Sequence, residues 1–255
     1  MRNGMDDENI LLKSTVLGVE VACVDKSQLL KLVLGWCKQQ TKRTVMYVNA
    51  HCLNLAATHP DYHDLLNKAD LVYADGISVV WASRYLGGCR MHKITGREWI
   101  YDLCSLAAQL GVKIAILGGV PGIAQKAAQN LVNLYPNLQI VSIAHGFLSE
   151  QEEQDYFRNL AELTPDVLFI GMGTPKQERW IMQNRPVIAA PVCWAIGATF
   201  NYVAGVEKPL PNWLERFQLE WLWRLMMNPK NKWSRYLIGN PLFILRIIKQ
   251  KCSIN

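Results

Sequence analysis

An apolar run followed at once by glycines and polar side chains stands at residues 166–180, DVLFIGMGTPKQERW. Val167–Gly171 is the kind of run that a buried parallel strand requires. Thr174 is the expected N-cap of the next helix, with Pro175 as its first residue. Backbone N–H groups at such a strand end can bind a ligand, and more polar groups are present than a cap needs. The candidate site residues here are Gly171, Gly173, Lys176, Gln177 and Glu178.

Polar residues also follow other apolar runs. Asn49 comes after Thr44–Val48, and Asp75 comes after Leu71–Tyr73. The carboxyl ends of parallel strands form one sheet edge, so these side chains are expected to cluster there. Asp75 is equally consistent with two roles: a functional carboxylate, or the N-cap of a helix that begins at Ile77.

The turn Gly118–Gly122 follows a further apolar run and can cradle a phosphate, which makes Gly118 and Gly119 candidates. The first strand-to-helix turn has no G-x-G-x-x-G, which disfavours a dinucleotide dehydrogenase. Walker and G-x-S-x-G motifs are also absent from the sequence. No Asp-x-Asp pair is available to hold a divalent cation against a diphosphate, so no metal is predicted. His59 and His63 are four residues apart, but we interpret them as surface residues because Pro60 lies between them.

Strand-like and helix-like segments alternate over residues 1–205, which predicts a parallel sheet with helices on both faces. The expected strands are Thr15–Val19, Thr44–Val48, Leu71–Tyr73, Lys113–Leu117, Gln139–Ile143, Val167–Ile170 and Val192–Ile196. The expected helices are Lys26–Lys38, Ile77–Leu86, Glu98–Leu110, Gly122–Leu134 and Glu150–Leu163, with Asp25 and Ser149 as N-caps.

Residues 206–255 differ in composition from the rest of the chain. They carry nine Lys or Arg and three Glu, so the whole net charge of +6 lies there, together with four of the nine tryptophans. The pattern predicts a helical appendage with helices over 211–227, 230–238 and 242–251. Apolar helices edged with cations are typical of contact with an anionic membrane surface. An ordinary docked helix and a nucleic-acid-binding tail remain as alternatives.

The seven cysteines are scattered and include no Cys-x-x-Cys pair. This favours a reduced cytosolic protein without a disulfide framework. Asp6, Asp7 and Glu8 lie near the start of the sequence, and no positive-then-apolar pattern of a signal peptide is expected there.

Together these motifs resemble the WecG/TagA/CpsF family of glycosyltransferases over about residues 17–243. The segments that carry the resemblance, in order, are VNAHCLNLA, ADLVYADG, Thr95-Gly96, the LGG turn, His145-Gly146-Phe147, GMGTPKQE, FNYVAG and LEWLWR. The most specific of them are GMGTPKQE and LEWLWR.

The resemblance implies a bacterial, inverting glycosyltransferase that needs neither a metal nor another cofactor. Such an enzyme would move N-acetylmannosamine, its uronic acid or a hexose such as glucose from a UDP-sugar to a polyprenyl-diphosphate-linked saccharide in cell-wall or surface polysaccharide synthesis. It implies a Rossmann-like core and an appendage that meets the cytoplasmic face of the plasma membrane and completes the site. Nucleic acid is not an expected partner, and a homo-oligomer is left open.

By position in the family's motifs, Asp75 looks like the general base, and Asn49 and Gln177 look like positioning residues. Inversion needs one carboxylate to take the acceptor proton, and a departing diphosphate must be met by N–H groups and cations. Arg224 looks like a diphosphate-contacting residue, although it is also spaced to pair with Glu220. The substrate-binding candidates are Tyr47, Lys93, Thr95, Gly118, Gly119, Gly171, Gly173, Lys176, Glu178, Asn201, Arg224 and Arg235.

Several positions depart from the family pattern. Asn201 replaces an Asp associated with the nucleotide base, Tyr47 replaces a Thr, Lys93 replaces an Arg, and Lys230-Asn231 replaces an arginine pair. Most of the charge is kept, but the bidentate geometry of arginine is not. These departures favour a donor different from that of the best-known members. They leave open a non-catalytic protein that binds nucleotide sugars or acts as a scaffold, as well as a soluble nucleotide-cofactor enzyme.

Overall fold

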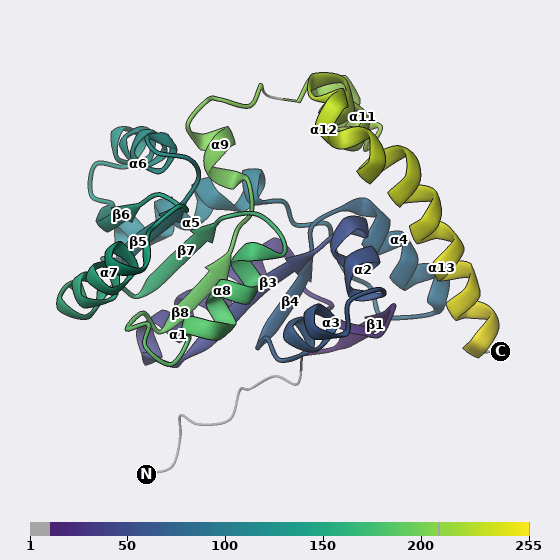
Figure 1. The fold of residues 1–255 in the computed structure, drawn as a ribbon, viewed down its shortest axis with the longest axis horizontal. Helices are drawn as coiled ribbons and strands as arrows, with labels where there is room; N and C mark the ends of the chain where they lie inside the picture. Colours follow the sequence, from purple (N-terminus) through teal and green to yellow (C-terminus); the bar gives the residue numbers. More distant parts are fainter. Residues whose placement is uncertain (1–10, 209, 255) are drawn as a thin grey trace, which may run out of the picture.

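The computed structural model describes residues 11–208 and 210–254. Residues 1–10 of the predicted unit 1–205, and residues 209 and 255 of the predicted unit 206–255, lie outside the described residues. A six-stranded sheet has the order β4-β3-β8-β7-β5-β6, and every neighbouring pair in it is parallel (Figure 1). The strands are β3 Arg43–Val48, β4 Leu71–Ala74, β5 Lys113–Gly118, β6 Gln139–Ala144, β7 Val167–Gly171 and β8 Val192–Ala195. The predicted Rossmann-like parallel sheet is therefore confirmed.

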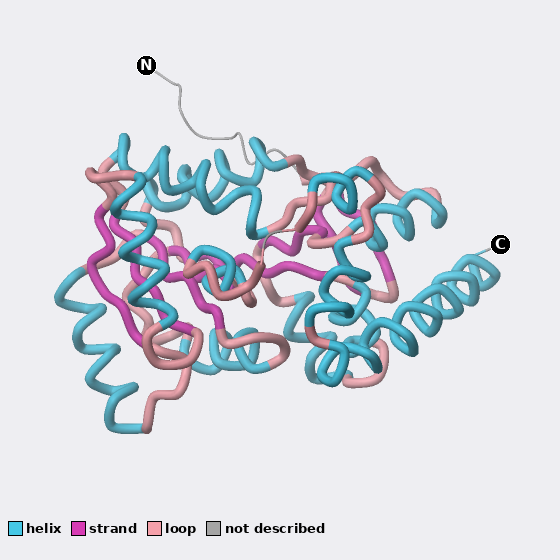
Figure 2. Tube along the Cα trace, turned by 90° about the horizontal axis from the view of Figure 1, so that it is seen from above, coloured by secondary structure: helices cyan, strands magenta, loops and turns pink. Residues whose placement is uncertain are grey.

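Helices cover both faces of the sheet, as Figure 2 shows from above. One face packs on α1 Lys26–Gln39, α5 Gly96–Leu110, α6 Ile123–Leu134 and α9 Thr199–Val203. The other packs on α2 Ala50–Ala56, α3 Pro60–Asn67, α4 Ile77–Leu86, α7 Glu150–Leu163 and α8 Lys176–Asn184. Successive residues of a strand alternate between the two cores: in β8, Trp194 joins one core, and Cys193 and Ala195 join the other. Both faces are apolar, which explains why the strands appear in the sequence as continuous apolar runs.

The predicted helix starts at Asp25 and Ser149 are confirmed. The Asp25 carboxylate accepts the N–H of Gln28 at 2.8 Å, and the Ser149 hydroxyl accepts the N–H of Glu152 at 3.4 Å. In each case the third helical residue bonds back to the N-cap, which completes a capping box. The short helices α2 and α3 were not predicted, because seven or eight residues contain too few turns for a clear helical period.

The single strand predicted at Thr15–Val19 is wrong. This segment forms an antiparallel hairpin, β1 Lys13–Val16 and β2 Val19–Ala22, outside the main sheet. The two turn residues, Leu17 and Gly18, have φ values of +50° and +81°. A two-residue turn with positive φ matches the twist of a hairpin, but a leucine in it hides the usual sequence signal.

The C-terminal unit consists of helices, as predicted, but their boundaries differ. They are α10 Asn212–Arg216, α11 Glu220–Met227, α12 Pro229–Trp233, the π-helical η1 Ser234–Ile238 and α13 Gly239–Ile254. The helix predicted over 211–227 is interrupted near Gln218, whose φ is +58°. The predicted break at Gly239 is also wrong. There the Gly239 N–H bonds to the Ser234 carbonyl, five residues back, and this wider turn accommodates Pro241, which has no N–H.

Helix α13 packs along α2 and α4 (Figure 1). Phe243 and Ile247 are buried in the core on that side. The Arg246 guanidinium donates to the backbone and side-chain oxygens of Asn54 at 2.9 and 2.8 Å. The side-chain oxygen of Gln250 accepts the Leu17 N–H of the hairpin at 2.9 Å. One face of α13 is thus an ordinary docked face.

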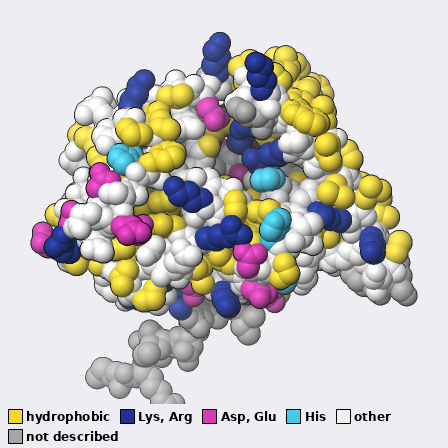
Figure 3. All heavy atoms as spheres, in the orientation of Figure 1, with side chains coloured by type: hydrophobic (Ala, Val, Ile, Leu, Met, Phe, Trp, Pro, Cys, Tyr) yellow, Lys and Arg dark blue, Asp and Glu magenta, His cyan; other side chains and the backbone are white. Residues whose placement is uncertain are grey.

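The opposite face of the C-terminal helices is apolar and exposed. Its large exposed side chains are Trp213, Phe217, Met226, Met227, Trp233, Leu237, Ile238, Leu242, Ile244, Leu245 and Ile248. We call this set the apolar belt; hydrophobic side chains gather over the same helices in Figure 3. None of the described helices combines the length and the apolarity that crossing a bilayer requires.

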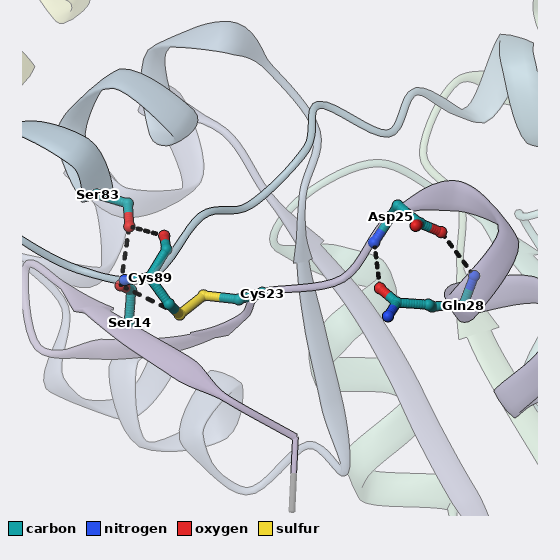
Figure 4. The surroundings of a disulfide bond; sticks show 6 residues. All are labelled: Ser14, Cys23, Asp25, Gln28, Ser83 and Cys89. Atoms are coloured by element: carbon teal, nitrogen blue, oxygen red, sulfur yellow. Dashed lines mark hydrogen bonds between the residues drawn. A yellow bond between two sulfur atoms is a disulfide. The ribbon is translucent and has the colours of Figure 1, made fainter. Parts of the chain in front are cut away.

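A disulfide joins Cys23, just after β2, to Cys89, just after α4 (Figure 4). The expectation of reduced thiols throughout is therefore wrong for this pair, whose 66-residue separation hid it in the sequence. The neighbouring Ser14 hydroxyl accepts the N–H of Cys89 at 2.9 Å and a hydrogen bond from the Ser83 hydroxyl at 2.8 Å. The other cysteines are free, and all of them except Cys252 are buried.

Candidate active site

A cleft opens at the carboxyl ends of β3, β4 and β8, below helices α11 and α12. It has two lobes, of about 210 Å³ and about 100 Å³. We call the larger the sheet lobe, lined by Tyr47 and Gly197 among others, and the smaller the helix lobe, lined by Lys93 and Gln218 among others. Figure 3 shows the surface hollowed there, with Lys, Arg and His side chains around the hollow. The residues that line both lobes are Asn49, His51, Asp75, Thr95, Glu220, Arg224 and Arg235.

Asp75 lies where the two lobes meet. Its backbone N–H donates to the Val48 carbonyl at 2.8 Å, which extends the pairing of β4 with β3. The N-cap of α4 is Gly76. The Asp75 carboxylate therefore does not cap this helix, which was one of the two roles that the sequence left open. Instead the Asn49 amide nitrogen lies 3.5 Å from Oδ2 of Asp75. The Asp75 carboxylate is therefore turned to the cleft.

The environment of Asp75 makes it a stronger base than an ordinary carboxylate. Burial raises the pKa of Asp75 to about 6; Glu220 adds to the rise, while Arg224, Asn49 and Arg235 oppose it. A group with this pKa is mostly ionised at neutral pH, yet it binds a proton more tightly than a solvent-exposed aspartate does.

Asn49 and His51 come from the turn between β3 and α2. The Asn49 Oδ1 accepts the N–H groups of His51 and Cys52 at 3.1 and 3.2 Å, which caps α2 and fixes the side chain beside Asp75. Burial and the charge of Arg235 lower the pKa of His51 to about 4. Its imidazole is therefore neutral at pH 7 and can both donate and accept a hydrogen bond. His51 was not predicted, although its place two residues after Asn49 offered a signal.

Cationic side chains surround the carboxylate. Arg224 of α11 and Arg235 of η1 line both lobes, Lys93 lines the helix lobe, and Arg97 and Lys232 line the sheet lobe. Burial and the neighbouring charges of Arg224 and Arg235 lower the pKa of Lys232. Cations crowded in this way suit a multiply charged anion such as a diphosphate. Arg97 and Lys232 were missed, because the sequence does not show that α12 folds over the start of α5.

The pairing of Arg224 with Glu220 is confirmed, and its contact with a diphosphate stays a prediction. Its Nε and Nη2 lie 3.0 and 2.5 Å from Oε1 of Glu220, so the predicted pair along α11 forms. The guanidinium also lies over the ring of Tyr202, 5.5 Å from its centroid, and faces the cleft. Burial alone would lower the pKa of Arg224, but Glu220 and other acidic neighbours raise it above its ordinary value.

The GMGTPKQE turn reaches the cleft through Gly173 and Thr174, which line the sheet lobe. The predicted helix start is wrong by one residue: Pro175, joined to Thr174 by a cis peptide bond, is the N-cap, and α8 begins at Lys176. The Thr174 hydroxyl does not cap the helix but donates to the Glu178 carboxylate at 2.8 Å.

Gln177 and Glu178 are fully buried beneath the sheet lobe. The side-chain oxygen Oε1 of Gln177 accepts the N–H of Gly197 at 3.0 Å. The side-chain nitrogen Nε2 donates to the Glu178 carboxylate at 2.8 Å and lies 3.5 Å from the Tyr47 hydroxyl. Burial raises the pKa of Glu178, an effect that its bonds to Gln177 and Thr174 oppose. These two candidate residues support the wall of the cleft rather than line it.

Tyr47 and Thr95 present hydroxyl groups to the cleft. Burial raises the pKa of Tyr47 well above its usual value, so it remains a neutral phenol that can donate a hydrogen bond. The Thr95 hydroxyl is buried and has no hydrogen-bond partner among residues 11–208 and 210–254. Thr95 lines both lobes, and it is also the N-cap of α5, where it faces Glu98 as in a capping box.

The remaining candidates lie outside the two lobes. Lys176 is directed away, and its Nζ donates to the Gly146 carbonyl at 2.7 Å. Gly118 and Gly171 touch through their backbones: a Cβ on Gly118 would lie 2.5 Å from the Gly171 carbonyl oxygen. This close packing also involves Gly119, whose N–H bonds to the Gly171 carbonyl at 2.9 Å.

One departure from the family pattern, Asn201, lies away from the lobes. Asn201 is on α9 and does not line either lobe, and its carbonyl accepts the N–H groups of Val206 and Glu207 at 2.9 and 3.2 Å. The side chain of Asn231 lies outside what the structure describes. In the described part of the chain, no group of three or more His, Cys, Asp or Glu side chains is placed to hold a metal ion.

A Rossmann-like sheet with carboxylates amid several cations at its carboxyl edge is typical of an enzyme for a phosphate-bearing substrate. A family model described as "Glycosyl transferase WecG/TagA/CpsF family" matches residues 14–255. The chain belongs to this family and is a glycosyltransferase.

The chain is similar over its whole length to proteins of Staphylococcus aureus. Relatives from strains MW2 and NCTC 8325 / PS 47 are each 28% identical over 254 residues, which cover 98% of this chain and 98% of theirs. Both are named N-acetylglucosaminyldiphosphoundecaprenol N-acetyl-beta-D-mannosaminyltransferase.

Proposed function

We propose that this glycosyltransferase moves a sugar from a UDP-sugar to a polyprenyl-diphosphate-linked saccharide, with inversion at the transferred carbon. The observation that carries the proposal is the position of Asp75, which lies where the two lobes of the cleft meet and beside the cations of α11 and η1. The names of the relatives point to N-acetylmannosamine as the sugar and to a diphosphoundecaprenol-linked N-acetylglucosamine as the acceptor.

In the proposed reaction Asp75 acts as the general base. Its carboxylate takes the proton from the acceptor hydroxyl as that oxygen attacks the anomeric carbon of the donor. The bond from that carbon to the diphosphate oxygen breaks on the opposite face, so the configuration inverts. Asn49 holds the carboxylate in place through its amide, 3.5 Å from Oδ2. The raised pKa of Asp75, about 6, gives it more basicity than a free aspartate.

The leaving diphosphate gains negative charge as the sugar departs, and this charge must be stabilised. Arg224, Arg235 and Lys232 are the side chains that we assign to this role. Arginine binds phosphate oxygens through two parallel N–H groups, which fixes both charge and orientation. We propose that these cations meet the leaving charge without a metal ion or another cofactor.

We assign sugar recognition to the wall of the cleft that carries Tyr47, Thr95 and His51. Thr95 offers a buried hydroxyl without a described protein partner, and Tyr47 offers a neutral phenol. Neutral His51 can read a sugar hydroxyl as either donor or acceptor. Gln177 and Glu178 hold the wall from below, so they are positioning residues.

We propose that the apolar belt rests on the cytoplasmic face of the plasma membrane, where a polyprenyl-linked acceptor resides. The belt includes two tryptophans, Trp213 on α10 and Trp233 on α12, and exposed lysines lie on the C-terminal helices as well, Lys230 on α12 and Lys249 on α13. Aromatic and alkyl groups enter the acyl boundary while cations meet anionic head groups. The cleft would then open beside the membrane surface.

The decisive experiment is a panel of UDP-sugars offered with a polyprenyl-diphosphate N-acetylglucosamine acceptor, followed by product analysis. The proposal expects one donor to give a single inverted linkage, and it expects Asp75→Asn to abolish that product. If the protein binds UDP-sugars but transfers none of them, the proposed transfer is refuted. Product formation that depends on added divalent metal would refute the assignment of charge stabilisation to the cations alone.

A further inference from the structure

A second carboxylate lies in the cleft and has no role in the proposed chemistry. Glu220, in the first turn of α11, lines both lobes together with Asp75. Its side chain is 25% exposed, and that of its partner Arg224 is 22% exposed. An ordinary i,i+4 pair lies on an exposed helix face, where it contributes little. This pair instead lies where a phosphate-bearing substrate must enter.

The way Glu220 holds Arg224 resembles the way a phosphate would. One oxygen, Oε1, accepts hydrogen bonds from both Nε and Nη2, at 3.0 and 2.5 Å. These two N–H groups form the side of the guanidinium that grips phosphate oxygens. The guanidinium is held from another direction by Tyr202, over whose ring it lies at 5.5 Å. The position of Arg224 therefore does not depend on Glu220 alone.

The carboxylate also faces the other cations of the cleft. Burial would raise the pKa of Glu220, but the charges of Arg224, Arg97 and Lys93 lower it below its ordinary value. Glu220 is thus a full negative charge inside a site for an anion. None of the residues of α11 is fully buried, so this helix is held less firmly than the helices that pack on the sheet.

We propose that Glu220 is an internal stand-in for the diphosphate: it occupies Arg224 when the cleft is empty, yields it to the diphosphate of the donor, and takes it back as the nucleoside diphosphate leaves. This rests on the proposed function, because it assigns a role at the same site. The effect is to weaken the affinity for both donor and product, so that the product departs quickly. A carboxylate that merely orients Arg224 would have the opposite effect and would strengthen binding.

The test measures binding of UDP and of inorganic diphosphate to the full-length protein by calorimetry. We expect Glu220→Gln to bind both about tenfold more tightly or better, because a neutral amide competes with the diphosphate for Arg224 less strongly than a carboxylate does. The matched control is Glu162→Gln, which removes one exposed charge on α7, far from the lining of either lobe. We expect it to leave both affinities unchanged.

A double-mutant cycle shows whether Glu220 acts through Arg224. In an Arg224→Gln background the substitution Glu220→Gln is expected to lose most of its effect on diphosphate binding. In steady state Glu220→Gln is expected to lower KM for the donor without a gain in kcat, and to make inhibition by UDP stronger.

The inference is overturned if Glu220→Gln binds inorganic diphosphate with unchanged or lower affinity while the protein remains folded. It is also overturned if the gain persists in full when Arg224 is absent. A protein that shows the diphosphate gain but transfers no UDP-sugar would refute the proposed function and leave this inference standing.

Discussion

The substitution Asp75→Asn tests two effects of the buried carboxylate, its contribution to the transfer rate and its effect on the free energy of unfolding. The pKa of Asp75 rises from 3.8 to about 6, a difference of about 2 units. One unit corresponds to about 1.4 kcal/mol, so the ionised carboxylate destabilises the fold by up to about 3 kcal/mol at neutral pH. Asparagine has nearly the same shape and no charge. We therefore expect Asp75→Asn to lose transfer by about 10²- to 10⁴-fold and yet to be as stable as the wild type or more stable.

The sign of the pH dependence follows from the raised pKa. In the unfolded chain Asp75 ionises near pH 3.8, but in the folded protein it ionises only near pH 6. The penalty is therefore absent below about pH 4, grows as the pH rises to about 6, and stays constant above that. The stability gain of Asp75→Asn should follow the same course, and wild-type transfer should rise with pH through about 6.

The assay is thermal or denaturant unfolding of both proteins between pH 4 and pH 8, alongside transfer rates. A gain of 1 kcal/mol would raise Tm by about 2–4 °C in a chain of this size. Asp64→Asn is the matched control, because Asp64 is exposed and its only described ion pair is with His63. Near-normal turnover of Asp75→Asn, or a clear loss of stability at pH 7, would refute the reasoning.

Three further perturbations test other parts of the structure. Gln177→Ala leaves a buried backbone N–H without its acceptor, so we expect a loss of about 1–3 kcal/mol in unfolding free energy together with reduced transfer; an unchanged Tm would contradict the buried network. The pair Ile244→Glu and Leu245→Glu should weaken binding to anionic vesicles without lowering Tm, since both side chains are exposed; sedimentation that matches the wild type would exclude this face. Reduction of the Cys23–Cys89 disulfide should cost about 2–4 kcal/mol, because it releases a long loop; an equal Tm with and without reductant would show that the bond contributes no stability.

The sequence was a good guide to the parallel sheet because its strands, apart from the edge strand β6, are largely buried on both faces. Such strands must be apolar throughout, and the long helices between them show a clear period. The same logic failed at the hairpin around Leu17 and at Gly239. At the hairpin, a leucine stands in a turn position with positive φ, where glycine or asparagine is usual. At Gly239, a π-helical turn accommodates Pro241, although a proline at this point of the sequence predicts the end of a helix.

The candidate site was found only in part. Asp75, Asn49 and the GMGTPKQE turn each follow a strand, so the rule that ligands bind at the carboxyl edge was enough to select them. That rule does not distinguish a side chain that lines a cleft from one that supports it. Gln177 is fully buried, and Lys176 bonds to the Gly146 carbonyl. These differences depend on which way a side chain points, and this is decided by packing.

By itself, the sequence determined the fold class, the alternation of strands and helices, and the collection of charge in the last fifty residues. Only the tertiary structure decided that the helices carrying this charge fold back over the sheet. There Arg224, Lys232 and Arg235 line the same lobe as Asp75. It also placed Glu220 within the site and paired Cys23 with Cys89. The reason is that periodicity and capping are local properties of a chain. Contacts between residues far apart in the sequence depend on how whole helices pack together, which no local pattern records.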